Sequence, residues 1–301
     1  MARELFDFKS VNGDELIGTK WIADNAIGNV VILTGMECHA GRYDDFAAFL
    51  NSNGYNVFAL DHYGQGENSK DGKLGIAPHS AFSKQVRNTD DIVKMCNKSK
   101  LPTYIFGHSM GSFLVQDYIQ RFSKKVSKAI ICGSNGPNGG GAFKFGYTVS
   151  KMIVPEKKRD KKGNFFIKLV FGGYNKKIKN PKTAFDWLSV NEENVQKYIA
   201  DPLCGYGSSY GFFREFFKGG SRLYKSKFLK KISPDIKLFV IAGTEDPVGA
   251  YGKGPKKLAE MYKKLGVKDV QLKLYENMRH EILNETDKQV VYNDILAFLK
   301  A

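Results

Sequence analysis

The chain has 301 residues, long enough for one large domain or for a domain with an insertion, and its 46 lysine and arginine residues against 31 acidic ones give a formal net charge of +15. No run of about 18 apolar residues occurs, and acidic residues stand where a signal peptide needs an apolar run, so neither a transmembrane helix nor a signal peptide is expected. The four cysteines, at positions 38, 96, 132 and 204, lack the spacing of a disulfide framework, so we expect free thiols in a cytoplasmic protein.

The first part of the chain predicts a hairpin followed by alternating strands and helices. Asn12-Gly13, a strong hairpin-turn signal, lies between strand-like residues 5–8 and 16–21. Apolar strands and amphipathic helices then alternate, at residues 29–33, 43–52, 55–60, 82–97, 102–106, 113–119 and 128–132. Such alternation predicts a mostly parallel sheet, here preceded by an antiparallel hairpin.

A Gly-His-Ser-Met-Gly sequence at 107–111 joins the strand at 102–106 to the helix that follows it. A nucleophilic serine at such a turn must stand exposed on a strained backbone. Side chains at the two flanking positions would collide with the neighbouring helix and strand, so both positions become glycine. The pattern predicts that Ser109 is the nucleophile of a serine hydrolase, between the elbow glycines Gly107 and Gly111. His108, the variable residue of the turn, is expected to pack inward.

The alternation of strands and helices stops at about residue 138 and resumes at about 231. Helical runs are expected around 146–154, 165–171, 191–198 and 210–224. We predict that residues 138–230 form a helical lid, inserted after the sixth strand between two core segments, 1–137 and 231–301. A structural elaboration away from the site is the alternative.

Much of the excess positive charge lies in this segment, between Lys144 and Lys182. A solvated basic surface is one interpretation, and attraction to anionic lipid headgroups or to an acidic substrate is the other. Contact with a membrane would combine cations with apolar side chains, at Lys157, Lys158, Arg159, Lys161, Lys162, Phe165, Phe166 and Ile167. Nucleic acid is not an expected partner, because no helix-turn-helix, RNA-recognition or zinc motif accompanies the tract.

Two late strands, at residues 236–242 and 270–275, each lead into a candidate for an acid or a base. Asp246 follows the first strand, and His280, the only histidine after Ser109, follows the second. The order serine, acid, histidine is that of hydrolases with a nucleophile elbow, and α/β sheets place their sites at the carboxyl ends of strands. Glu245 and Asp201 compete with Asp246 for the role of the acid.

These motifs together resemble the monoacylglycerol lipase and lysophospholipase branch of the α/β-hydrolases, also called the serine aminopeptidase S33 type. The resemblance covers nearly the whole chain. The sequence TGMECHAGRY at 34–43 is similar to the family loop HGxxxHxxRY, and other family motifs recur at 61–69, 107–111, 187–205, 243–249 and 280–285. The chain departs from the family at Thr34 and at Gln65, where histidine is usual.

The resemblance implies an α/β-hydrolase fold and a serine ester hydrolase that works through an acyl-enzyme. Ser109 would be the nucleophile, His280 the base and Asp246 its orienting acid, with the backbone amides of Met36 and Met110 as the oxyanion hole. The expected substrate is an ester of a single-chain lipid, a monoacylglycerol or a lysophospholipid. The alternatives are a carboxylesterase for short-chain or aromatic esters, an S33-type peptidase, and a non-catalytic binding protein with the same fold.

Apolar lid residues are candidates for lining an acyl channel, with core packing as the alternative: Phe143, Phe145, Tyr147, Met152, Ile153 and Val154. The expected substrate-binding residues are Gly35, Met36, Met152 and Ile153. No metal is expected, because Asn284 stands where a zincin has its second histidine, and no glycine-rich nucleotide motif indicates a cofactor. Peripheral contact at the inner face of a membrane stays open, and the sequence does not indicate an oligomeric state.

Overall fold

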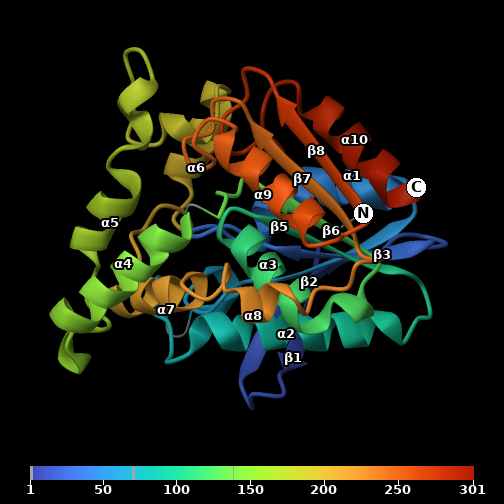
Figure 1. Cartoon of the computed structure of the whole chain (residues 1–301), viewed down its shortest axis with the longest axis horizontal. Helices are drawn as coiled ribbons and strands as arrows, with labels where there is room; N and C mark the ends of the chain where they lie inside the picture. The colour runs from blue at the N-terminus through green and yellow to red at the C-terminus, as the bar shows by residue number, and fades with distance from the viewer. Residues whose placement is uncertain (1–2, 70–71, 138) are drawn as a thin grey trace.

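A single eight-stranded sheet forms the centre of the molecule. The structure, a computed structural model, describes residues 3–69, 72–137 and 139–301. The strands run in the spatial order β1-β2-β4-β3-β5-β6-β7-β8 (Figure 1). β1 pairs with β2, and β2 with β4, in antiparallel fashion, and all other pairs are parallel. The predicted architecture, a mostly parallel sheet with an N-terminal antiparallel hairpin, is therefore confirmed.

The eight strands and the first three helices of the core lie close to their predicted positions, whereas its last two helices were not among the predicted elements. The strands are β1 (Glu4–Lys9), β2 (Glu15–Trp21), β3 (Gly28–Leu33), β4 (Tyr55–Leu60), β5 (Thr103–His108), β6 (Lys128–Cys132), β7 (Lys237–Gly243) and β8 (Asp269–Tyr275). The core helices are α1 (Asp44–Ser52), α2 (Ala81–Asn97), α3 (Met110–Phe122), α9 (Lys253–Lys264) and α10 (Lys288–Lys300). Short 3-10 helices include η1 (Ala40–Tyr43), η2 (Gly66–Asn68), η4 (Ser123–Lys125), η5 (Glu156–Lys158), η6 (Tyr174–Lys177) and η7 (Asp186–Leu188).

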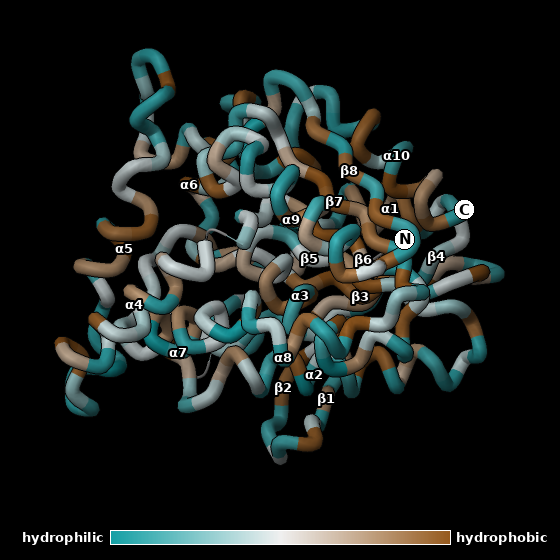
Figure 2. Tube along the Cα trace, in the orientation of Figure 1, coloured by the Kyte–Doolittle hydropathy of each residue, from teal (hydrophilic) through white to brown (hydrophobic). Residues whose placement is uncertain are grey.

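Helices cover both faces of the sheet, which explains why the central strands β3, β5 and β6 are buried along their whole length. On one face, side chains of β3 and β5 such as Val31 and Ile105 pack with those of α2, α3 and α9. On the other face, Val30 and Phe106 pack with side chains of α1 and α10. Figure 2 shows the resulting arrangement, with hydrophobic strands at the centre and hydrophilic segments around them.

Five α-helices lie between β6 and β7, within the segment 139–230, which we call the cap. They are α4 (Gly139–Ile153), α5 (Asn164–Phe171), α6 (Glu192–Ala200), α7 (Tyr210–Gly220) and α8 (Ser226–Leu229). Figure 1 shows α4, α5, α6 and α7 gathered on one side of the sheet, at the left of the view. The four predicted helical runs fall on these helices, although α4 begins at Gly139 rather than near residue 146. Asn138, the expected first residue of the lid, lies outside the described residues.

Aromatic side chains join the cap to the core. Phe143 of α4 contacts Phe113 of α3 and Phe216 of α7, with ring centroids 5.1 and 5.2 Å apart. Two residues expected to face a membrane instead belong to this interior. Phe166 is fully buried. Arg159 is only 4% exposed, and its guanidinium lies 3.4 Å from the buried carboxylate of Glu215. The expectation that both contact lipid is therefore wrong.

Within the residues described, no helix combines the length and the apolar composition that a membrane span requires.

Candidate active site

Ser109 occupies the sharp turn between β5 and α3. Its φ of 53° and ψ of −118° place a residue with a side chain in a strained region of backbone space. Its amide donates to the carbonyl of Cys132 at the end of β6 (3.0 Å), and its carbonyl accepts the amide of Ser112 (2.9 Å). The turn is thereby held on both sides.

The two glycines around Ser109 allow α3 to approach the sheet closely. A Cβ atom added to Gly107 would collide with the backbone of Gly111, and one added to Gly111 would collide with the backbone of Leu33 in β3. Neither obstacle is a flexible side chain, so a larger residue at either position would move α3 away from β3 and β5. The close approach on which the sequence argument depends is present in the structure.

Asp246 and His280 meet beyond the ends of β7 and β8. Nδ1 of His280 lies 3.0 Å from Oδ2 of Asp246, and both side chains are almost fully buried. The other oxygen of Asp246 accepts the amide of Val248 at 2.8 Å. Neither competing acid reaches His280: the carboxylate of Glu245 is half-exposed and lies 3.7 Å from Arg279, and that of Asp201 is paired with His39.

Two aromatic rings hold the imidazole of His280. The ring of Trp187 from η7 lies 5.1 Å from it, and the ring of His108 lies 4.7 Å from it, centroid to centroid. Nε2 of His280 is buried and has no hydrogen-bond partner among the described residues. Ser109 and His280 line the same cavity. Trp187 was part of a family motif in the sequence, but nothing in the sequence marked it as a neighbour of His280.

His108 packs inward, as expected, and connects two parts of the site. Its Nε2 lies 3.1 Å from the carbonyl oxygen of His280, and its Nδ1 lies 3.3 Å from the hydroxyl of Tyr43. The amide of Gly35 donates to that hydroxyl at 3.2 Å. Burial lowers the pKa of His108 to about 4, so its imidazole is neutral at pH 7. Nε2–H then donates to the carbonyl, and Nδ1 accepts from Tyr43.

The loop between β3 and η1, residues 34–39, is fixed by Gln65. The side-chain amide of Gln65 donates to the carbonyls of Gly35 (2.9 Å) and Cys38 (3.0 Å), and its oxygen accepts the amide of Glu37 (3.0 Å). The departure from the family histidine at this position therefore leaves the loop firmly held. Sequence reasoning did not find this role, because a single glutamine has no periodic or spacing signal.

The amides expected to form an oxyanion hole are free to bind a ligand. Neither the amide of Met36 in the β3–η1 loop nor that of Met110, at the first turn of α3, donates to an acceptor among the described residues. At the start of the loop, Nε2 of His62 lies 3.1 Å from the carbonyl oxygen of Thr34. Burial lowers the pKa of His62 to about 4, which keeps its ring neutral. The hydroxyl of Thr34 is buried with no partner among these residues.

Two cavities reach Ser109, and both are also lined by Met36, Phe171 and Trp187. The first cavity has a volume of about 270 Å³. Apart from Ser109, Asn135 and Tyr174, its lining side chains are mostly apolar, including Phe113, Phe143, Phe145, Leu169, Phe216 and Phe217. The second has a volume of about 380 Å³ and adds charged and polar side chains, namely Glu37, Lys162, Lys168, Asn175 and Glu281. The site therefore offers one apolar and one polar compartment.

The four expected substrate-binding residues separate into two pairs. Gly35 and Met36 line the larger cavity. Met152 and Ile153 line neither cavity, because the end of α4 turns them toward solvent, where their exposures are 79% and 39%.

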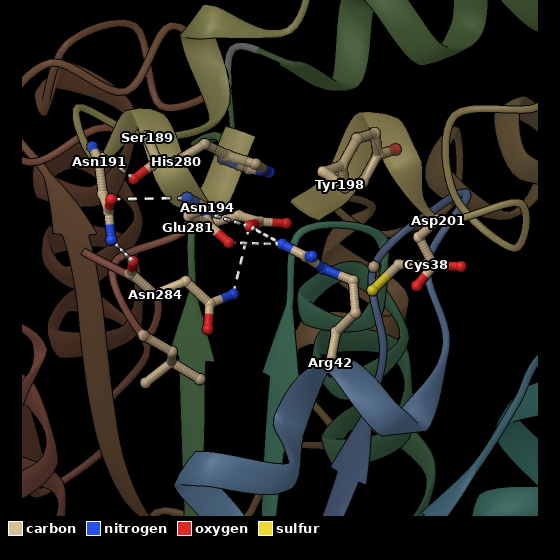
Figure 3. Close-up of polar contacts among 12 residues, drawn as sticks. Cys38, Arg42, Ser189, Asn191, Asn194, Tyr198, Asp201, His280, Glu281 and Asn284 are labelled. Carbon is tan, nitrogen blue, oxygen red and sulfur yellow. Dashed lines mark hydrogen bonds and ion pairs between the residues drawn. The ribbon is translucent and has the colours of Figure 1, made fainter. Parts of the chain in front are cut away.

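Glu281, the residue that follows His280, forms a buried ion pair with Arg42. The guanidinium of Arg42 contacts the carboxylate of Glu281 at 2.5 Å and the amide oxygen of Asn194 at 2.8 Å (Figure 3). Asn194 from α6 also donates to Glu281 at 2.8 Å. Burial alone would raise the pKa of Glu281, but the charge of Arg42 and these hydrogen bonds hold it below its ordinary value. The pair thus fixes the His280 segment to η1 and to the cap.

One cluster has the donor types of a metal site. Ligand atoms of His39, Asp201 and Cys204 lie within 4.8 Å of one another. The amide of Gly41 donates to Nδ1 of His39 (3.2 Å), so Nε2 carries the proton that it donates to Asp201 (2.8 Å). Burial also raises the pKa of the Cys204 thiol far above its ordinary value, which opposes the thiolate that a metal needs. The cluster is better described as a hydrogen-bonded pair between the β3–η1 loop and the cap.

Comparisons with known proteins agree with this architecture. The model of the family "serine aminopeptidase, S33" matches residues 24–287. A monoacylglycerol lipase of Mycolicibacterium smegmatis is 26% identical, over 99% of this chain and 97% of its own length. A carboxyl esterase from Bacillus coagulans, solved in complex with glycerol, superposes with a TM-score of 0.90 at 26% identity, over 100% of this chain and 98% of that one. The monoglyceride lipase of Saccharomyces cerevisiae, solved with a substrate analog, shares the fold, with a TM-score of 0.77 at 20% identity over 99% and 95% of the two chains.

Proposed function

Because the chain belongs to the serine aminopeptidase S33 family of α/β-hydrolases, in its monoacylglycerol lipase branch, we propose that it hydrolyses carboxylic esters of single-chain lipids with Ser109, His280 and Asp246 as its catalytic residues. The observation that carries the assignment is the orientation of the imidazole. Asp246 accepts the proton on Nδ1 of His280, so Nε2 is the basic nitrogen, and Nε2 is the buried atom without a partner among the described residues.

The reaction then proceeds through an acyl-enzyme. Nε2 of His280 takes the proton of Ser109 as Oγ attacks the ester carbonyl, and Asp246 stabilises the imidazolium. The amides of Met36 and Met110 donate to the oxyanion of the tetrahedral intermediate. His280 returns the proton to the leaving alcohol and afterwards activates the water that releases the acid.

The two cavities support an assignment of the two ends of the substrate. The apolar compartment, with Phe143 and Phe216 among its walls, suits an acyl chain, and the polar one suits the alcohol. A monoacylglycerol is therefore the first candidate. A lysophospholipid with an anionic headgroup is the second, since Lys162 and Lys168 line the polar compartment and neither has a carboxylate partner among the described residues.

A peptidase activity has less support from the charges of the cavity. An aminopeptidase must hold the free α-ammonium group of its substrate, which calls for an unoccupied carboxylate. The two carboxylates that line the polar compartment are both engaged: Glu281 with Arg42, and Glu37 with the backbone amides of Gly207 and Ser208. An ester without a charged amine fits this arrangement better.

The cap is proposed to act as a lid that also contacts an anionic membrane. Large apolar side chains are exposed on α4 and α5, namely Phe145, Met152, Ile153, Phe165 and Leu169. Exposed lysines lie in the chain segment between α4 and α5, including Lys157, Lys158 and Lys161. Apolar side chains rimmed by cations match a surface of acyl chains and anionic headgroups.

Replacement of Ser109 by alanine tests the proposal. The variant should lose about 10⁴-fold in kcat on p-nitrophenyl decanoate and should no longer be labelled by a fluorophosphonate, since no other residue supplies the attacking oxygen. Ser52→Ala, at an exposed site on α1, is the matched control and should behave as the wild type. Activity of Ser109→Ala within tenfold of the wild type would rule out the nucleophile. A wild type that takes no label would favour a non-catalytic binding protein.

A further inference from the structure

Glu37 follows Met36 in the β3–η1 loop and has an unusual backbone. Its φ is 55°, in the left-handed region where side chains are disfavoured, and the residue is only 6% exposed. Such a conformation is unfavourable for a residue with a side chain, and burial of a carboxylate is more unfavourable still unless the carboxylate is hydrogen-bonded. A glycine would fit this backbone without strain. Specific contacts must therefore offset the cost of the strained backbone and of the buried carboxylate.

The contacts of its carboxylate and of its carbonyl oxygen come from the cap. The two oxygens of the Glu37 carboxylate accept the amides of Ser208 (2.7 Å) and Gly207 (3.2 Å). Its carbonyl oxygen accepts the hydroxyl of Tyr198 (3.0 Å) and the amide of Gly205 (3.3 Å). Hydrogen bonds from amides to an ionised carboxylate are the stronger kind, so this is a firm attachment.

The glycines of the cap make this attachment feasible. Gly205 and Gly207 have φ values of 59° and 80°, and the successive amides of Gly207 and Ser208 both donate to the Glu37 carboxylate. Groups of amides arranged in this way form a concave binding site for an anion. Here the anion is supplied by the protein itself, from the loop that carries Met36.

On its other side, Glu37 is attached to the core. Its amide donates to Gln65, which also holds Gly35 and Cys38. The amide of Met36 therefore lies in a loop segment whose next residue is fixed both by the core and by the cap. A shift of the cap segment 205–208 would pull on Glu37 and change the direction of the Met36 amide.

We infer that Glu37 is a positioning residue that couples the cap to the oxyanion hole, so that the Met36 amide is correctly placed only when segment 205–208 is in the position seen here. The inference rests on the proposed serine hydrolase function. Glu37 acts through Met36 and need not touch the reacting atoms. It links closure of the cap to stabilisation of the transition state rather than to binding of the substrate.

The test separates these two effects with two ligands. A decyl trifluoromethyl ketone is attacked by the serine and places an oxyanion in the hole, whereas 1-O-decylglycerol, an ether, only occupies the cavities. Glycine suits the left-handed backbone at position 37. In Glu37→Gly, kcat should fall by about ten- to a hundredfold, which is only part of the loss expected when an oxyanion donor is removed. Affinity for the ketone should fall in parallel, while KM and affinity for the ether should change by less than about threefold.

Further variants show whether the attachment itself matters. Glu37→Gln keeps one acceptor oxygen and should recover part of the loss, and Tyr198→Phe, which removes one cap contact, should give a smaller loss of the same kind. Glu193→Gln, exposed on α6, is the matched control and should leave kcat unchanged. Equal losses of ketone and ether affinity would show that Glu37 only keeps the shape of the cavity.

The outcome also distinguishes this inference from the proposed function. If the wild type hydrolyses the ester and binds the ketone, and Glu37→Gly does both equally well, only the inference about Glu37 is wrong. If the wild type does neither, the proposed function is wrong and the inference is rejected with it.

Discussion

The neutral state of His108 makes the stability of the fold depend on pH. Its Nε2–H donates to the carbonyl of His280, while its Nδ1 accepts from Tyr43, whose hydroxyl already accepts the amide of Gly35. Protonation of Nδ1 would leave the Tyr43 hydroxyl without an acceptor and place a charge in the interior. The pKa of His108 is about 4 in the folded protein, mainly because of burial, against an ordinary value of about 6.5.

The sign and size of the effect follow from this difference. Because the folded pKa lies below the unfolded one, the stabilising contribution is complete above pH 6.5 and is lost as the pH falls toward 4. With pKa values of about 6.5 and 4, the unfolded state gains about 2 kcal/mol relative to the folded state between pH 7.5 and pH 5. His62 should contribute in the same direction, since burial lowers its pKa to about 4. Asp61 opposes both, since burial raises its pKa to about 6.

Urea unfolding of the wild type and of His108→Gln, at pH values from 7.5 to 5, isolates the contribution of His108. Glutamine donates and accepts hydrogen bonds but does not titrate, and the contributions of His62 and Asp61 cancel in the comparison. The free energy of unfolding should fall by about 2 kcal/mol more in the wild type than in His108→Gln over this range. His79→Gln, at a histidine whose side chain is 67% exposed, is the control and should keep the wild-type slope. Equal slopes for the wild type and His108→Gln would refute the reasoning.

Two further predictions concern the acid of the triad and the membrane surface. Asp246→Asn should lower kcat by about 10³- to 10⁴-fold on p-nitrophenyl decanoate, because asparagine no longer fixes the tautomer of His280. Glu245→Gln should change kcat by less than about twofold. The reverse result would assign the acid to Glu245. Replacement of Lys157, Lys158 and Lys161 by glutamine should weaken co-sedimentation with anionic vesicles at least tenfold at low salt, since each cation contributes roughly 1 kcal/mol, and should leave hydrolysis of the dissolved ester unchanged. A wild type that does not bind anionic vesicles at low salt would contradict the membrane proposal.

The sequence predicted the parts of the molecule that depend on local patterns. Apolar runs identified the buried strands. The position of Ser109 followed from the glycines on either side of it, because the turn leaves no room for a side chain at those two positions. Asp246 and His280 could be expected near each other because both follow the carboxyl ends of strands in one parallel sheet. These expectations need no knowledge of which distant side chains pack together.

The contacts between the cap and the core could not be predicted in this way. Glu37 and Ser208 lie far apart in the chain, and so do Trp187 and His280, and neither pair has a recognisable spacing. Polar residues in loops have no periodicity from which their orientation can be read. Their partners are decided by how the cap packs on the sheet, which is a property of the tertiary structure.

The position of Met152 and Ile153 outside both cavities has a more specific cause. The end of α4 is apolar, and an apolar run on a helix does not by itself show which face is buried. The buried face of α4 is marked instead by Phe143, Gly146 and Ser150, at spacings of three and four residues. Gly146 lies against the ring of Phe217 in α7, where a Cβ atom would be too close. Small residues at helical spacing were the informative signal, because they mark where two helices approach each other.

Gln65, which stands where histidine is usual in the family, suits the three backbone groups that it contacts. Three backbone groups of the β3–η1 loop face this side chain: two carbonyls, from Gly35 and Cys38, and the amide of Glu37. A carboxamide supplies two donors and an acceptor at once, whereas a neutral imidazole supplies one of each and would leave one buried carbonyl without a donor. A carboxamide also has no proton to lose near neutral pH. The loop that carries the Met36 amide is therefore held by a group that does not titrate in the range where His280 must act as a base.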